Sequence, residues 1–311
     1  MGGYTMAIPG TRTKEKAEIH IDLEKCNGCG LCVSVCKDFS LIIGNNKARE
    51  STSPMFGCIG CGHCMAICPT GAITIKGRTL SPQDLFDLPL KKDMATYSQL
   101  LALCQSRRSI REFTSKSVDP GIIEKILQLA KTAPMGLPPS EVNILVLEGS
   151  VKTRAFASDF THYLEGMQWF VSGWFLALMR PFWGRASDAL FKSFVRPMFK
   201  GFITNMEQGV NLVNYDAPLA MYFYGSPYCD PADPIIAATY AMLAAESMGF
   251  GTCMLGSVHP LIQNGGKAKK FRERYHIKYT SREGLFVIFG YPAVKYQKGI
   301  ERSFASVTRV E

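Results

Sequence analysis

The chain has 311 residues, of which 47% are hydrophobic, and a formal net charge of +9 at pH 7. This length exceeds one small domain and suits a small domain joined to a medium one, with enough apolar residues for a sizeable core. The basic residues form no recognisable base-reading module, so nucleic acid is not expected as a partner. An anionic cofactor, an acidic protein partner or a membrane surface would each suit the positive charge.

The N-terminal stretch from Met1 to His20 has no apolar segment and no cleavage site of the kind that a secretory signal peptide needs. We therefore expect a cytoplasmic, reducing location. Of the 11 cysteines, most fall into two regular groups. The remaining Cys104, Cys229 and Cys253 lack metal-ligand spacing and are expected to be buried thiols.

Residues 17–22 alternate apolar and polar side chains, which predicts a short strand. The spacing C-x2-C-x2-C-x3-C then occurs twice, starting at Cys26 and at Cys58. Three thiolates at this spacing surround one face of an iron–sulfur cube, and in two-cluster ferredoxins the fourth comes from the other repeat. A structural zinc site would use fewer cysteines, and a disulfide scaffold would require a secreted chain.

The repeats therefore predict two [4Fe–4S] clusters with exchanged fourth ligands. His63 lies between ligands of the second repeat and is not expected to bind iron, because sulfur already fills the four places. The first cluster is assigned Cys26, Cys29, Cys32 and Cys68, and the second is assigned Cys58, Cys61, Cys64 and Cys36.

After the second repeat, residues 71–75 are expected to pair with the first strand and to close a ferredoxin-like domain. Pro82 and Pro89 indicate a linker, and a helix near Tyr97 opens a second domain. The predicted organisation is a ferredoxin domain at 17–80, a linker at 81–95 and a second domain at 96–311.

In the second domain, Asp119 and Pro120 open a helix that should run to about Lys131. A longer helix should begin at Asp233 and stop at Gly249. The other predicted elements are an exposed basic helix at 267–278, a buried strand at 142–147, a strand at 219–224 and a segment at 285–290 that closes the core.

Three arginines and a hydroxyl lie within five residues, directly after the first helix of this domain. Guanidinium groups bind phosphate through paired, charge-assisted hydrogen bonds, which favours an anion site. By itself, such a group could equally be a solvated basic turn. The residues are Arg107, Arg108, Ser109 and Arg111.

Four short motifs occur in order in this domain: Arg-Arg-Ser-x-Arg-x-Phe at 107–113, Ala-Pro-x-Gly at 133–136, Gly-Phe-Gly-Thr at 249–252 and Gly-Tyr-Pro at 290–292. On these motifs, the chain from Tyr97 onward resembles the FMN-dependent nitroreductase family. With its N-terminal part it resembles the ferredoxin–nitroreductase fusions. The resemblance implies an α+β fold, in which a ferredoxin-like two-cluster domain precedes a nitroreductase-like FMN-binding α+β sandwich. It also implies a homodimer with FMN at the subunit interface.

The same resemblance implies an FMN site built from several segments. The arginine group would hold the phosphate and ribityl chain, backbone N–H groups after the 249–252 motif would face flavin N5, and a basic tail would reach the phosphate. Many members carry Asn and a Gln-Pro-Trp run after the Ala-Pro-x-Gly motif, whereas residues 137–143 here read Leu-Pro-Pro-Ser-Glu-Val-Asn, a departure that concerns the loop's side-chain contacts to the flavin. The implied residues are Arg107, Arg108, Ser109, Arg111, Pro134, Met135, Gly136, Leu255, Gly256, Ser257, Lys298 and Arg302.

The stretch 160–213 is unusually apolar and holds Trp169, Trp174 and Trp183. Its uncharged part at 166–179 is shorter than the ~20 residues that a membrane-spanning helix needs. Three interpretations remain open. The segment could be a dimer interface and active-site cover, an amphipathic membrane-contact surface, or a pocket for a large hydrophobic substrate such as a quinone.

Together these features predict an iron–sulfur flavoprotein oxidoreductase. Electrons would pass from a low-potential donor, reduced ferredoxin or NAD(P)H, through two [4Fe–4S] clusters to FMN and on to a small organic acceptor: a nitroaromatic, a quinone or an activated alkene. No catalytic side chain is assigned, because the flavin performs the chemistry, and His162 and His259 are expected to be ordinary polar residues. Two alternatives are a non-enzymatic electron-transfer module of a larger complex and a membrane-surface quinone reductase.

Overall fold

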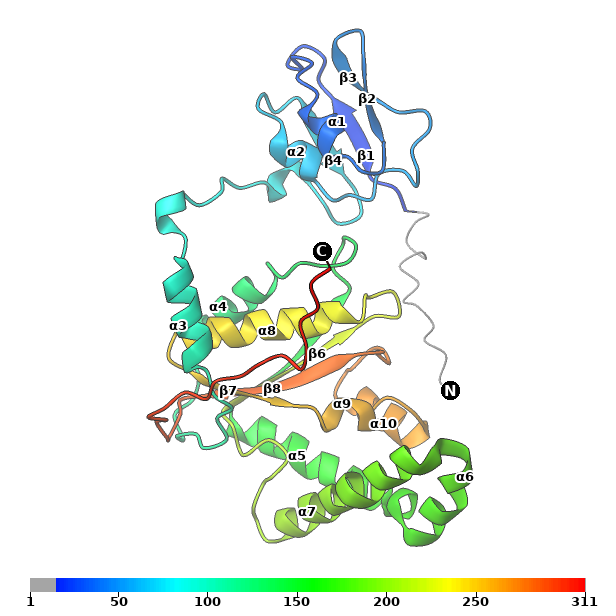
Figure 1. The fold of residues 1–311 in the computed structure, drawn as a ribbon, viewed down its shortest axis with the longest axis vertical. Helices are drawn as coiled ribbons and strands as arrows, with labels where there is room; N and C mark the ends of the chain where they lie inside the picture. The colour runs from blue at the N-terminus through cyan, green and yellow to red at the C-terminus, as the bar shows by residue number, and fades with distance from the viewer. Residues whose placement is uncertain (1–14, 311) are drawn as a thin grey trace.

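The computed structural model describes residues 15–310. Residues 1–14, which make up most of the N-terminal stretch expected to contain no signal peptide, lie outside the described residues. A small N-terminal domain sits above a larger one, and a segment with little secondary structure joins them (Figure 1). The linker contains only short 3-10 turns, η2 (Pro82–Asp84) and η3 (Lys91–Asp93).

The small domain is built around two antiparallel strand pairs. β1 (Glu18–Ile21) pairs with β4 (Ile73–Lys76), which confirms the predicted pairing. A second pair, β2 (Leu41–Gly44) and β3 (Lys47–Glu50), was not predicted. Two one-turn helices follow the cysteine loops, α1 (Leu31–Val35) and α2 (His63–Ile67).

The larger domain begins with α3 (Tyr97–Ser106), which Thr96 caps by accepting a hydrogen bond from the backbone of Gln99. No residue of α3 is buried, because the helix stands beside the domain rather than in its core (Figure 1). The prediction that Cys104 is a buried thiol was therefore wrong, whereas Cys229 and Cys253 are buried as expected.

A four-stranded antiparallel sheet in the order β5-β6-β8-β7 forms the centre of this domain. The central strands β6 and β8 are buried over their whole length, since helices cover both faces. The edge strand β5 is only half-buried, so the prediction of a buried strand there was wrong in that respect. The strands are β5 (Val142–Glu148), β6 (Leu219–Gly225), β7 (Gly251–Leu255) and β8 (Gly284–Gly290).

Two layers of helices enclose the sheet. One face packs against α4 (Pro120–Ala130) and α8 (Ala232–Ser247), whose apolar side chains meet alternate residues of β6 and β8. The other face packs against α5 (Ser150–Glu165), α9 (Val258–Leu261) and α10 (Gly266–Arg274). The predicted exposed basic helix corresponds to α10, which ends earlier than expected and buries Ala268 and Phe271.

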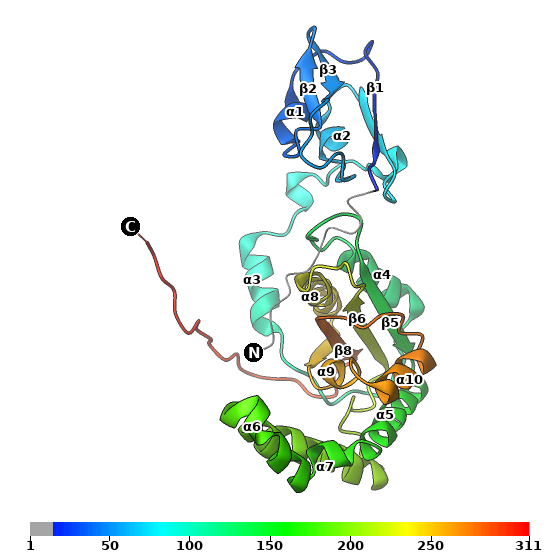
Figure 2. The same cartoon turned by 90° about the vertical axis from the view of Figure 1, so that its right-hand side faces the viewer.

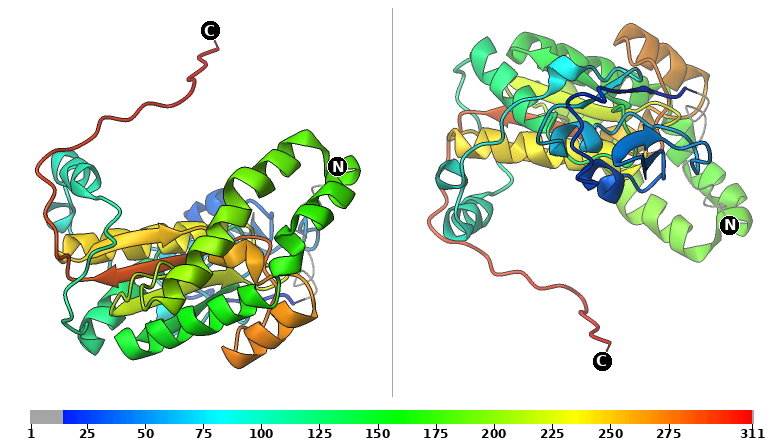
Figure 3. Two further views of the ribbon diagram at one scale, coloured as in Figure 1. Left: turned by 90° about the horizontal axis from the view of Figure 1, so that it is seen from below. Right: turned by 90° about the horizontal axis from the view of Figure 1, so that it is seen from above.

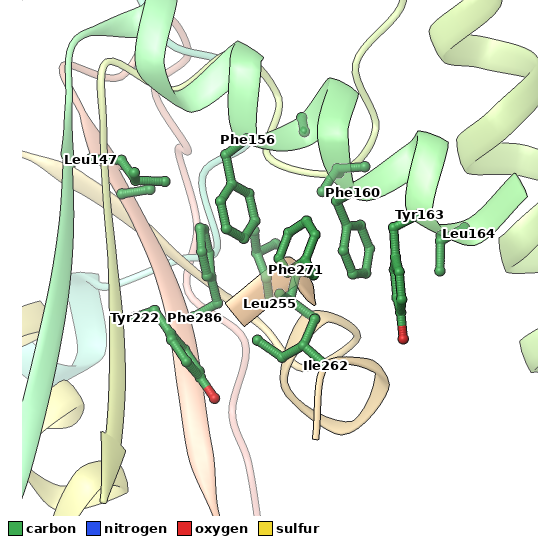
Figure 4. Packing of buried hydrophobic residues seen from close by; sticks show 14 of the residues in the cluster. Leu147, Phe156, Phe160, Tyr163, Leu164, Tyr222, Leu255, Ile262, Phe271 and Phe286 are labelled. Carbon is green, nitrogen blue, oxygen red and sulfur yellow. The ribbon is translucent and has the colours of Figure 1, made fainter. Parts of the chain in front are cut away.

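The core under α5 is aromatic. Phe156 lies 4.9 Å from Phe286 of β8 and 5.4 Å from Phe271 of α10, measured between ring centroids, and Phe160 continues the row along the helix (Figure 4). Rings from three elements are thus interlocked, and such packing fixes α5 and α10 on the sheet.

The apolar stretch forms a helical arm. It contains η4 (Gln168–Val171), α6 (Gly173–Leu190), a π-helical turn η5 (Phe191–Val195) and α7 (Arg196–Glu207). The arm packs against α5, on the side of the larger domain farthest from the small domain (Figures 1 and 3). No helix among residues 15–310 is long and apolar enough to cross a membrane.

Replacing Tyr222 by phenylalanine should lower the free energy of unfolding of the larger domain by about 1–3 kcal/mol. The buried hydroxyl lies 2.8 Å from His259 Nδ1 and accepts a hydrogen bond from Gln263 Nε2 at 3.0 Å. His259 is thus a satisfied buried polar residue, as expected, and burial lowers its pKa. Urea unfolding followed by tryptophan fluorescence measures the effect. The exposed Tyr228→Phe is the matched control, and equal losses in both variants would contradict this account.

Candidate functional site

The first set of cysteines surrounds a small cavity in the N-terminal domain. Its lining comes entirely from that domain. Backbone amides point at the sulfurs: Ala48 N–H donates to Cys26 Sγ at 3.4 Å and Ala72 N–H to Cys68 Sγ at 3.3 Å. Amide hydrogen bonds to sulfur are a standard feature of iron–sulfur sites, so the cavity suits a cluster. The four cysteines are Cys26, Cys29, Cys32 and Cys68.

The second set lines a larger cavity of about 560 Å³. Gly60 and Gly62 of this repeat have φ values of 70° and 76°, a left-handed backbone that favours glycine and lets the loop curl around its contents. His63 also borders the cavity. The four cysteines are Cys36, Cys58, Cys61 and Cys64, so each cavity combines three cysteines of one repeat with one of the other.

The thiols of each set influence one another. Burial, assisted by the neighbouring sulfurs of Cys58 and Cys61, raises the pKa of Cys64 to about 12. Such a thiol ionises at neutral pH only when a cation binds its sulfur, so metal binding should release protons. Within residues 15–310, no three His, Cys, Asp or Glu side chains are grouped as around a single metal ion. The cysteines instead surround a cavity, which suits a group larger than one ion.

The predicted arginine group lies at the start of β7. Ile110 N–H donates to Thr252 O at 2.9 Å, and Ser109 forms a parallel bridge with Thr252. Among the described residues, Arg107 Nη1 and Arg108 Nε are buried and find no acceptor in the chain. Buried guanidinium nitrogens without a partner are unfavourable unless an anion accepts from them, so these residues fit a phosphate.

Two neighbours of this group were not singled out in the sequence. Glu246 accepts a hydrogen bond from Thr252 Oγ1 at 2.9 Å, and burial raises its pKa while Arg107 opposes that rise. Arg111 lies over the ring of Tyr215, 5.8 Å from its centroid. The one sequence feature that could have indicated Glu246 is its position near the end of α8, after the uncharged stretch 234–245.

The C-terminal tail reaches the same place. A Cβ added to Gly299 would lie 2.8 Å from Arg108 Nη2, so the backbone between Lys298 and Arg302 passes directly over this guanidinium. Beyond that contact the tail extends away from the domain and is exposed (Figure 2). The arginine group and the basic tail are therefore brought together.

The remaining predicted cofactor residues lie elsewhere. Leu255 ends β7, and Gly256 and Ser257 follow it, at the end of the strand away from the arginine group. Pro134, Met135 and Gly136 precede β5, at the opposite edge of the sheet and the opposite end from the arginines. A seven-residue strand spans about 20 Å, so this loop and the arginine group do not meet within one chain.

Comparison with known proteins decides the family. The profile of the nitroreductase family matches residues 104–291, more than half of the chain. The chain belongs to the nitroreductase family. The profile of a 4Fe-4S dicluster domain matches residues 13–73, so the N-terminal domain of this nitroreductase-family protein carries iron–sulfur clusters. No match was found among curated proteins.

Two solved structures are similar to the larger domain. A nitroreductase with bound FMN from Bacteroides fragilis is 16% identical, with a TM-score of 0.51, covering 68% of this chain and 99% of its own. A nitroreductase with bound FMN from Desulfitobacterium hafniense is 20% identical, with a TM-score of 0.49, covering 68% of this chain and 98% of its own. The family match and the Bacteroides fragilis structure confirm the predicted α+β nitroreductase-like fold.

Proposed function

We propose that this protein is an iron–sulfur flavoprotein oxidoreductase that takes electrons from a low-potential donor and delivers them to a small organic acceptor. One observation carries the proposal. A single chain combines two four-cysteine cavities with a group of arginines, two of whose buried nitrogens lack an acceptor among residues 15–310. Bound clusters would supply one-electron steps, and bound FMN would combine two electrons into a hydride equivalent.

The residues of the chain have separate tasks in this proposal. The eight cysteines hold the clusters in the exchanged arrangement described above, and backbone amides at their sulfurs raise the reduction potentials. The FMN phosphate and ribityl chain are bound by Arg107, Arg108, Ser109 and Arg111. Lys298 or Arg302 of the tail adds a further positive charge at the phosphate. Backbone N–H groups at Leu255, Gly256 and Ser257 face the flavin ring. No side chain acts as a nucleophile.

A homodimer would complete the flavin site. The loop Pro134–Gly136 cannot reach the arginine group of its own chain, but a second copy could bring its loop there. Exposed apolar residues support a partner subunit: Tyr97 and Leu100 of α3 are 78% and 49% exposed, and Phe304 of the tail is 84% exposed. Sedimentation of the FMN-loaded protein should give twice the monomer mass of 34.4 kDa.

The donor is proposed to be reduced ferredoxin or a similar acidic carrier in a cytoplasmic setting, which suits the net charge of +9. NAD(P)H is the competing donor. Flavin reduction by a ferredoxin should depend on intact cluster cysteines, whereas reduction by NADH at the flavin should not. Equal rates of flavin reduction by NADH and by ferredoxin, both unaffected by loss of the clusters, would contradict a donor that acts through the small domain.

Anaerobic purification with assays for iron, sulfide and flavin tests the proposal. About eight irons and one FMN per chain are expected. An acceptor screen with nitroaromatics, quinones and activated alkenes should then show turnover. Full iron without flavin, even after FMN is added, would contradict the proposal and favour a non-enzymatic electron-transfer module.

One observation favours a second function, a quinone reductase at a membrane surface. On α6 the side chains of Trp174, Leu178 and Phe182 are 64%, 59% and 79% exposed, and Arg180 and Arg185 lie on the same helix. Aromatic and basic residues together suit the headgroup region of a bilayer. Sedimentation with anionic liposomes, lost when Trp174 and Phe175 become glutamates, would support this function, and no sedimentation would exclude membrane contact through the arm.

A further inference from the structure

The two cysteine cavities differ in their surroundings. The cavity of Cys26, Cys29, Cys32 and Cys68 is lined only by residues of the small domain. The cavity of Cys36, Cys58, Cys61 and Cys64 is lined on one side by the nitroreductase domain, through the loop 133–138. A cluster in the second cavity would therefore face the flavin domain, and a cluster in the first would not.

The loop also borders the interior of the nitroreductase domain. Ala133, Pro134 and Met135 line a further cavity of about 470 Å³, which holds no cysteine and lies between α4, β5 and α8. These three residues have the cluster cavity on one side and this cavity on the other. Gly136 N–H donates to Asp233 Oδ1 at 3.0 Å, which fastens the loop to the start of α8. The loop thus separates the cluster cavity from a cavity of the nitroreductase domain.

Arg78 holds this contact in place. Its Nη2 donates to Pro138 O of the loop at 2.8 Å, and its Nη1 donates to Glu15 O at 2.7 Å. The same residue packs against the second cysteine repeat, because a Cβ added to Gly60 would lie 3.3 Å from Arg78 Cβ. One side chain therefore joins the second cluster loop to the flavin domain.

We propose that the cluster held by Cys36, Cys58, Cys61 and Cys64 is the electron donor, through the loop 133–138, to the flavin whose phosphate the arginine group of a second copy of the chain holds, and that the other cluster receives electrons from the external donor. This inference rests on the proposed function and deepens it. Electrons arrive singly from a low-potential one-electron protein. Two of them, with one proton from solvent, convert one FMN to the anionic dihydroflavin (FMN + 2e⁻ + H⁺ → FMNH⁻). No other reactant is required.

The first test concerns the contact and needs no flavin. In Arg78→Ala the loop is released, water enters the second cavity, and the midpoint potential of that cluster should shift, because cluster potentials depend on solvent exposure. The potential of the first cluster should stay unchanged. Redox titration followed by EPR measures the midpoint potentials of both clusters in the full-length protein. The control is Arg49→Ala, an exposed arginine of β3 that donates to Gly44 O and does not border the loop.

The second test concerns distance to the flavin. Cys29→Ala and Cys61→Ala each replace one exposed cysteine, in the first and second sets respectively. The spin relaxation of a one-electron-reduced flavin should be accelerated by the reduced cluster that remains in Cys29→Ala. It should be nearly unaffected by the cluster that remains in Cys61→Ala, since dipolar relaxation falls steeply with distance.

The outcomes separate this inference from the function on which it rests. A potential shift confined to the second cluster, together with faster flavin relaxation in Cys29→Ala, supports the inference. A shift of the first cluster, a shift of neither, or faster relaxation in Cys61→Ala overturns it. Failure of the protein to bind any FMN overturns the proposed function instead, and the Arg78→Ala titration then still decides which cluster faces the loop.

Discussion

Replacing Cys36 by alanine should reduce the iron content from about eight to about four atoms per chain, because a [4Fe–4S] cluster with three cysteines is labile. Cys36 stands in the first repeat of the sequence but lines the second cavity. The cluster that is lost should therefore be the second one. The EPR spectrum of reduced Cys36→Ala should match that of Cys61→Ala and differ from that of Cys29→Ala.

The exposed Cys104 provides a matched control for this prediction. It lies on α3, outside both cavities, so Cys104→Ala should retain about eight irons. Loss of the second cluster should also abolish flavin reduction by a protein donor, while flavin content stays constant. If Cys36→Ala keeps all its iron, or loses the first cluster, the exchanged-ligand arrangement is wrong.

Replacing Arg107 by alanine should raise the dissociation constant of FMN about ten- to a hundredfold, the effect of losing a charged hydrogen bond worth roughly 1.5–3 kcal/mol. Arg107 Nη1 is buried and finds no acceptor among the described residues, as expected if phosphate is its natural partner. Fluorescence titration of the flavin-free protein measures the change. The loss should grow less pronounced at high salt, since salt already weakens the wild-type interaction.

Two comparisons make the FMN prediction specific. Lys125 is exposed on α4. Lys125→Ala removes one positive charge, as Arg107→Ala does, but away from the arginine group, so this variant should bind FMN as the wild type does. Riboflavin lacks the phosphate, and its affinity should be nearly equal in Arg107→Ala and the wild type. Equal losses for FMN and riboflavin would show that the substitution disturbs the fold rather than a phosphate contact.

The parts of the fold that the sequence predicted depend on local chemistry. Cysteines that surround a cluster need fixed spacing, so the spacing alone predicted the two sets of four that line the two cavities. The runs 219–224 and 285–290 are continuously apolar because β6 and β8 are covered on both faces. The pairing of β1 with β4 followed from alternation and from the symmetry of the repeats.

Other features depend on tertiary arrangement. Strand order makes β5 an edge, so an apolar run there is only half-buried. Cys104 is exposed because α3 stands away from the core. The β2–β3 hairpin was missed although its turn residues Asn45 and Asn46, both with positive φ, are a recognisable signature.

The contact between the domains could not be predicted from the sequence. Arg78 follows the last strand of the small domain and looks like an ordinary linker residue, yet it donates to Pro138 O some 60 positions away. The sequence motif at 133–136 indicated a flavin loop, and only the structure places that loop against the second cysteine cavity. Contacts of this kind arise from domain docking, for which no local pattern exists.

The most direct test of the account is the order of reduction. The anaerobic protein is mixed rapidly with a reduced low-potential carrier protein, and absorbance is followed at wavelengths that separate clusters from flavin. The account predicts that the clusters bleach first and the flavin afterwards, and that flavin bleaching is lost in Cys61→Ala while FMN stays bound. Flavin that bleaches before the clusters, or at an unchanged rate in Cys61→Ala, would contradict it.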